Sequence, residues 1–166
     1  MIVVLGLGVA YAQDAKRTDA SPGPDKEAAR QAAPAKTKLS AEELEAKFKA
    51  TLTKATLSGR YCSINDGKLS PEKEDKYSIV SVTKTGADTW LINARIQYGQ
   101  IDIVAPIPVQ VKWAGDTPVI IVDNVGIPGG NTYSARVMIY EKTYAGTWSG
   151  GTRGGLLNGI VTNEKE

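Results

Sequence analysis

The hydrophobic positions of this chain change their period once, from a helical spacing to an alternating spacing that continues through the rest of the sequence. Leu44, Phe48 and Leu52 recur every four residues, which places them on one stripe of a short helix. Ser40 and Glu43 have the spacing of a capping box, which predicts that the helix begins at Ser40. We therefore predict a helix from Ser40 to Leu52 whose apolar stripe covers one end of a sheet.

From Leu57 onward apolar and polar residues alternate, and short turns rich in Gly, Asp and Asn separate the alternating segments. Short connections join antiparallel neighbours, because parallel strands need long crossovers. The longest connection, residues 64–75, ends in four charged residues and is predicted to be a solvated loop. The pattern thus indicates an antiparallel meander. Its eight strands are expected at residues 56–63, 76–84, 89–98, 101–113, 118–123, 132–140, 143–149 and 155–162.

The third and fourth predicted strands show which side of the sheet is dry. Residues of one parity, such as Trp90 and Val109, are apolar, whereas the other parity is mostly polar. Pro106 and Pro108 both fall on the polar parity, so together they remove two successive N–H donors from one lateral side of the strand. We therefore expect the sheet to be unpaired near residues 106–108, either as a gap in a barrel or as the edge of a sandwich.

The chain before residue 39 is predicted to contribute no folded domain. Residues 1–12 contain an apolar run that ends in Ala10-Tyr11-Ala12, the small-x-small pattern of a secretory signal peptide. The run is shorter than the ~20 residues that a membrane-spanning helix needs. No Lys or Arg precedes it, so we expect the true translation start to lie upstream. Cleavage after Ala12 would make this an exported protein, periplasmic or extracellular.

Residues 13–38 contain no large apolar side chain and mix Ala, Lys, Asp and Pro. Such a segment cannot bury enough surface to offset the entropy lost on ordering, so it is predicted to be a disordered tether. It leaves residues 39–166 as a single domain made of a helix and strands. Because the tether also carries the excess of Lys and Arg, this domain is neutral overall, although the whole chain has a net charge of +2. A neutral domain has no long-range field for a phosphate backbone, and nucleic acid is not an expected partner.

The sequence contains no histidine, so it lacks the commonest general base and the commonest metal ligand. The aspartates mostly fall in or near turns, where the carboxylate satisfies local backbone donors. We therefore expect no enzyme activity, no metal and no cofactor. These aspartates are Asp66, Asp88, Asp102, Asp116 and Asp123.

Cys62 is the single cysteine of the sequence and cannot form a disulfide within the chain. In an exported protein an odd cysteine either pairs between chains or remains a free thiol. Because Cys62 falls within a predicted strand, we expect a buried, free thiol.

Three features resemble the lipocalin-type (calycin) barrels: the leading helix, the opening strand Leu57-Ser58-Gly59-Arg60-Tyr61, and the final Gly146-Thr147-Trp148-Ser149-Gly150. The glycine-rich C-terminal part, from Tyr144 to Gly159, also resembles the tail of uncharacterised exported bacterial proteins. The first resemblance implies an eight-stranded meander closed into a barrel with an apolar interior.

Small barrels either fill their interiors with side chains or hold one small ligand. A ligand-binding barrel would enclose an apolar cavity of roughly several hundred Å³. An interaction module of the cell envelope would instead have a packed interior and an exposed apolar patch. Small inward residues either favour the cavity by leaving space or let neighbouring aromatic side chains pack and fill the core; these residues are Ala94, Ala105 and Gly146. The inward side chains predicted to contact a small apolar ligand are Trp90, Ile92, Ile96, Tyr98, Trp113, Tyr144 and Trp148.

Overall fold

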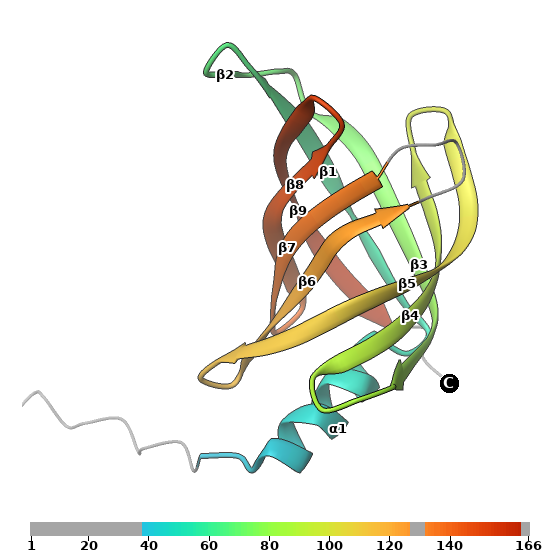
Figure 1. Cartoon of the computed structure of the whole chain (residues 1–166), viewed down its shortest axis with the longest axis vertical. Helices are drawn as coiled ribbons and strands as arrows, with labels where there is room; N and C mark the ends of the chain where they lie inside the picture. The colour runs from blue at the N-terminus through green and yellow to red at the C-terminus, as the bar shows by residue number, and fades with distance from the viewer. Residues whose placement is uncertain (1–37, 127–131, 164–166) are drawn as a thin grey trace, which may run out of the picture. The chain divides into compact units, whose positions relative to one another are not determined.

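The computed structural model describes residues 38–126 and 132–163, which form one helix and nine strands (Figure 1). The predicted leader (1–12) and all of the predicted tether except Lys38 lie outside the described residues. No helix within the described ranges is long and apolar enough to cross a membrane. The elements are α1 (Ala41–Leu52), β1 (Ala55–Asn65), β2 (Lys68–Leu69), β3 (Lys73–Lys84), β4 (Thr89–Tyr98), β5 (Ile101–Ala114), β6 (Thr117–Gly126), β7 (Thr132–Tyr140), β8 (Thr143–Gly150) and β9 (Arg153–Asn163).

Eight of the strands close into an antiparallel barrel. Each long strand pairs with the next in sequence, and β1 pairs with both β3 and β9, which completes the ring. The predicted fold class, an all-β antiparallel meander of eight strands preceded by one short helix, is confirmed. The alternation in β4 is also confirmed, because Trp90, Ile92, Ala94 and Ile96 are all buried.

The segment predicted as a long solvated loop instead forms a hairpin. β1 continues to Asn65, and Ile64 pairs with Leu69 of the short strand β2. Asp66 and Gly67 have φ values of 49° and 72°, the left-handed pair that a tight two-residue hairpin turn requires. The Asp66-Gly67 turn therefore brings the chain into a hairpin even though charged residues follow it. In Figure 1 this hairpin projects from the end of the barrel opposite α1.

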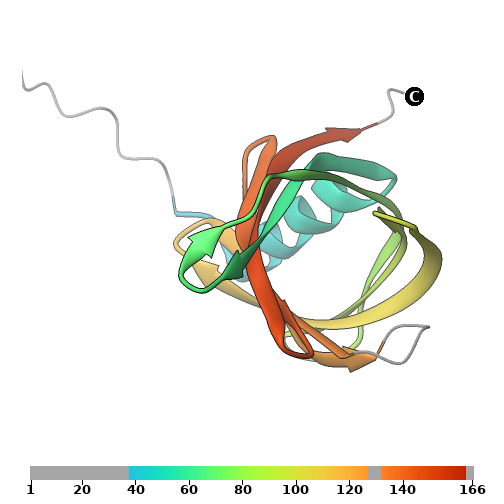
Figure 2. The same cartoon turned by 90° about the horizontal axis from the view of Figure 1, so that it is seen from above.

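Helix α1 covers one end of the barrel, as its apolar stripe predicted. The capping box is present, since Glu43 N–H donates to Ser40 Oγ (3.2 Å) and Ser40 N–H donates to Glu43 Oε2 (2.7 Å). Phe48 is buried and meets Trp90 edge-on, with ring centroids 5.2 Å apart, and it meets Trp113 in the same way at 6.3 Å. The end-on view in Figure 2 shows α1 lying across the barrel. One end of the interior is thus filled with aromatic side chains.

The ladder between β5 and β6 is incomplete, and this confirms the gap predicted from the two prolines. β5 pairs with β4 from Ile101 to Gln110, but its pairing with β6 begins only at Gln110. Pro106 and Pro108 lie within the unpaired part, where they have no N–H to offer. We call this interval, between residues 101–109 of β5 and residues 122–126 of β6, the slit.

Cys62 is only 7% exposed, which confirms the prediction that it is buried. It does not belong to the barrel core, since its parity on β1 is opposite to that of the inward Leu57 and Tyr61. Its register partner on the outer surface is Leu156 of β9.

Candidate functional site

A small apolar cavity lies inside the barrel, beside the slit. Its volume is about 160 Å³, and it is lined by residues from all eight strands of the barrel. Ile107 of β5 lies on one side of the slit, and Val122 and Val125 of β6 lie on the other. Five aromatic side chains form a large part of the wall, namely Tyr61, Tyr77, Tyr98, Tyr133 and Trp148. The remaining lining residues are Ile96, Leu157, Ser134 and Ala135.

Three of the seven residues predicted to contact a ligand, Ile96, Tyr98 and Trp148, line this cavity. The other four are buried or half-buried in the core away from it. Trp90 and Trp113 pack against Phe48 beneath α1. Ile92 is part of the buried core, and Tyr144 is hydrogen-bonded to a carboxylate, as described below. The structure therefore divides the predicted set between the cavity and the packed end of the barrel.

The small residues that were expected to leave space do not line the cavity. Ala94 and Ala105 are direct register partners on β4 and β5, and both are buried. Gly146 instead allows the paired strand β7 to lie close to β8, because a Cβ at this position would collide with the carbonyl of Arg136. The cavity is created by the slit and by large side chains around it. This explains why its volume is smaller than the several hundred Å³ expected.

Three of the tyrosines that line the cavity were not among the residues predicted to contact a ligand: Tyr61, Tyr77 and Tyr133. The alternation along their strands would have identified them as inward-facing. Tyr77 shares the inward parity of Ile79, and Tyr133 shares that of Ala135 and Val137. Their strands were predicted, but the alternation along them was not assigned to the inner and outer faces.

One carboxylate, Asp75, is buried in the barrel next to the cavity. It is 4% exposed, and its two oxygens accept hydrogen bonds from the phenols of Tyr77 (3.1 Å) and Tyr144 (2.9 Å). The prediction that this charged run is solvated is therefore wrong for Asp75. β3 already begins at Lys73, and the alternation along the strand points Asp75 into the barrel.

Two glycines make the bond between Tyr144 and Asp75 possible. Asp75, Gly59, Gly159 and Tyr144 are successive register partners across β3, β1, β9 and β8. A Cβ at Gly59 would collide with the Tyr144 hydroxyl, and one at Gly159 would lie 2.6 Å from the Tyr144 ring. The phenol therefore crosses two strands over bare backbone to reach the carboxylate.

Burial raises the pKa of the Asp75 carboxyl above its usual value, and the hydrogen bonds from the two phenols oppose this shift only in part. Burial also raises the pKa of Tyr77 and of Tyr144, and the adjacent Asp75 adds to both shifts. The two phenols therefore stay protonated and act as donors. No cation contacts Asp75 among the hydrogen bonds and ion pairs of the described residues.

We expect Asp75→Asn to be at least as stable as wild type at pH 7. The folded state binds the Asp75 proton more tightly than the unfolded state does, because the pKa is raised on folding. Ionisation of Asp75 therefore opposes folding above the unfolded pKa of about 4. Wild type should gain stability relative to the variant as the pH falls from 7 toward this value. Urea unfolding of both proteins at several pH values measures the difference.

Asp102→Asn is the matched control for this experiment. A hydrogen bond from Arg95 is the main cause that lowers the pKa of the Asp102 carboxyl, which is exposed on the outer face. This control should therefore show the opposite sign, with wild type losing stability relative to the variant in acid. If Asp75→Asn behaved like Asp102→Asn, the hydrogen bonds from the two phenols would lower the pKa of Asp75 by more than burial raises it.

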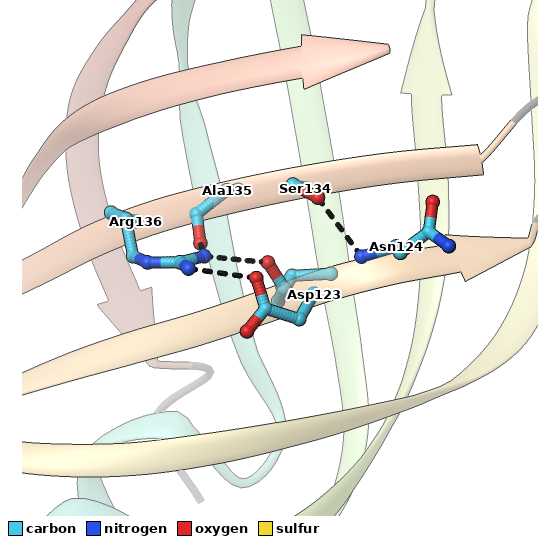
Figure 3. Close-up of polar contacts among 6 residues, drawn as sticks. Asp123, Asn124, Ser134, Ala135 and Arg136 are labelled. Atoms are coloured by element: carbon cyan, nitrogen blue, oxygen red, sulfur yellow. Dashed lines mark hydrogen bonds and ion pairs between the residues drawn. The ribbon is translucent and has the colours of Figure 1, made fainter. Parts of the chain in front are cut away.

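A bulge in β6 diverts that strand from β5 and so borders the cavity. The register with β7 shifts between Val122 and Val125, and Asn124 has a φ of 49°. Arg136 fixes the bulge, since it donates to the carbonyl of Val122 (2.8 Å) and to the carboxylate of Asp123 (2.7 Å; Figure 3). The extra residue increases the local twist, which turns the end of β6 away from β5.

Ser134 connects the bulge to the cavity. Its hydroxyl accepts a hydrogen bond from the Asn124 N–H (2.9 Å; Figure 3), and the residue also lines the cavity. The bulge and the unpaired prolines of β5 together produce the slit, and the slit in turn leaves room for the cavity.

The cavity is apolar, with a few polar groups in its wall. None of its described lining residues is charged, and its polar groups are tyrosine and serine hydroxyls and the indole N–H of Trp148. That indole donates to the Cys62 carbonyl (3.2 Å). Within the described ranges, no three side chains of the types His, Cys, Asp and Glu lie close enough together to hold a metal ion.

Comparison with known proteins identifies no relative of this chain. The chain matches no protein-family model, no curated protein and no solved structure. The structure therefore defines the class, a closed eight-stranded antiparallel barrel with one helix across its end, and this architecture is compatible with a lipocalin-like barrel.

Proposed function

We propose that this chain is an exported, non-enzymatic, lipocalin-like protein that binds one small apolar molecule inside its barrel. The observation that supports the proposal is the cavity of about 160 Å³, whose described walls are uncharged and largely aromatic or aliphatic. Binding sites for small molecules are typically concave and apolar with a few placed polar groups. The signal-peptide pattern of residues 1–12 supports the exported location.

Native mass spectrometry of the full chain, expressed with its leader and purified from the envelope fraction, tests this function. We expect a discrete extra mass on the folded protein that disappears on denaturation. Ala135→Phe should abolish the extra mass, because Ala135 lines the cavity and the added ring would occupy it. Ala145→Phe is the matched control, since Ala145 is exposed on the outer face of the neighbouring strand β8.

Two outcomes would contradict the proposal. A bare polypeptide mass in every preparation would remove the support for a bound ligand. An extra mass retained equally by Ala135→Phe and Ala145→Phe, with both variants folded by circular dichroism, would place the ligand elsewhere.

A structural or protein-interaction module of the envelope is the second candidate, and exposed apolar side chains on the outer face favour it. Ile64 and Leu69 pair on the projecting hairpin and are 48% and 61% exposed. Leu156 continues this surface beside Cys62. A bare mass combined with self-association that Ile64→Ser/Leu69→Ser removes, as measured by analytical ultracentrifugation, would favour this function instead.

A further inference from the structure

The size of the cavity limits the ligand to about one ring. An apolar cavity of about 150 Å³ in another protein holds benzene, whereas pockets for drug-sized molecules have roughly 300–1,000 Å³. The present cavity, at about 160 Å³, matches the smaller case. The cavity is open on one side, so a long acyl chain or a sterol would not be enclosed by it and would extend out of the opening.

The arrangement of the aromatic side chains favours a ring over an alkyl group of the same size. Tyr61 meets both Tyr98 and Trp148 edge-to-face, with centroid distances of 6.0 Å and 6.1 Å. All three side chains line the cavity. A further aromatic ring can extend this edge-to-face pattern, which stabilises ring pairs beyond the area they bury.

The electrostatics of the cavity favour a neutral ligand. No described lining residue carries a charge that could pair with an ionised group. The nearest carboxylate, Asp75, is bound to the hydroxyl of the lining residue Tyr77 and would repel an anion. Placing an unpaired charge in an apolar site has a large desolvation cost.

The cavity nevertheless offers one well-defined polar contact. The hydroxyls of Tyr98 and Tyr133 lie 3.3 Å apart and share a hydrogen bond that spans from β4 to β7, on either side of the slit strands β5 and β6. Burial is the main cause that raises the pKa of Tyr98, and the bond to Tyr133 adds to it, so this phenol stays neutral. Two hydroxyls that share one hydrogen bond keep one hydrogen for another acceptor. The described residues provide no acceptor for it.

We infer that the ligand is a neutral, single-ring aromatic molecule with one oxygen acceptor, held with that oxygen against the Tyr98–Tyr133 hydroxyl pair. This inference rests on the proposed function and names the ligand class for the same cavity. The ring would lie against the apolar wall that Tyr61 and Trp148 form together, and the slit lies directly beside the cavity.

A titration followed by ligand-observed proton NMR tests the inference with defined probes on the full chain. Acetophenone has the proposed ring and acceptor, toluene lacks the acceptor, benzoate is an anion of similar size, and tetramethylammonium is a small cation. We expect acetophenone to bind, and benzoate and tetramethylammonium to bind at least about tenfold more weakly because their charges remain unpaired.

The double variant Tyr98→Phe/Tyr133→Phe tests the hydroxyl pair. Both hydroxyls are removed together, because either one alone could still donate to the ligand. We expect acetophenone to bind about three- to tenfold more weakly to this variant, since one hydrogen bond is lost. Toluene should change by less than about twofold, because it makes no such bond.

Each contrary result identifies which statement fails. An equal loss of toluene and acetophenone would overturn the role of the hydroxyl pair. Tighter binding of benzoate or tetramethylammonium would overturn the neutral ligand. Binding of palmitate but not of the single-ring probes would overturn the ligand class while leaving the proposed function intact. If no probe binds and purified protein has no extra mass, the proposed function itself fails.

Discussion

Gly59→Ala is expected to lower the free energy of unfolding by about 3 kcal/mol. The added Cβ would collide with the hydroxyl of Tyr144 and with the carbonyl of Asn158 on the paired strand β9. Relief requires β9 to move away from β1 and Tyr144 to withdraw from Asp75, which leaves a buried carboxylate with one donor fewer. Urea unfolding followed by far-ultraviolet circular dichroism measures the change.

Gly126→Ala is the matched control for this substitution. A Cβ at Gly126 would meet no atom of the described residues within 4 Å, so we expect a change of less than about 0.5 kcal/mol. If Gly59→Ala proved as stable as Gly126→Ala, the ring of Tyr144 could not lie over Gly59 as described. The two variants differ from wild type by the same single methyl group, so the comparison isolates the space available at each site.

Phe48→Ala is expected to cost about 3–5 kcal/mol of stability, the range observed when a buried aromatic side chain is truncated. Phe48 is 2% exposed and has edge-on contacts with both Trp90 and Trp113. The substitution would leave a void at the end of the barrel that α1 covers. We expect an earlier urea transition together with a weaker near-ultraviolet circular dichroism signal from the two tryptophans.

Lys47→Ala provides the control in the same helix, because Lys47 is exposed and precedes Phe48 directly. Its effect should stay within about 0.5 kcal/mol. A loss of stability in Phe48→Ala without a change in the tryptophan signal would mean that the helix stabilises the barrel by some contact other than this aromatic cluster.

Local patterns in the sequence predicted the helix and the eight long strands, but not the hairpin between β1 and β2. The capping box of Ser40 and Glu43 fixes the start of α1, and the alternation through Trp90 and Val109 identifies inward positions correctly. Pro106 and Pro108 predicted an interruption of the ladder because a missing N–H has the same effect in any sheet. Each of these signals depends on residues that are close together in the sequence.

The cavity could be predicted only in part, because its walls depend on the register between distant strands. The bulge at Asn124 turns β6 away from β5, and alternation alone does not locate such an extra residue. Asp75 resembled a solvated charge because its two phenol donors come from its own strand and from β8. Gly59 and Gly159 could be recognised as a path for Tyr144 only once their strands were known to pair.

The pairing of β1 with β9 also determines when the barrel can form. Ala55 pairs with Asn163, so the ring of strands joins segments from nearly opposite ends of the folded domain. Closure of so long a loop is entropically slow compared with formation of the hairpins between consecutive strands. Until β9 pairs with β1, the sheet therefore stays open, with β1 lacking one neighbour. Closure of the barrel is then the last pairing to form, because it requires both ends of the domain.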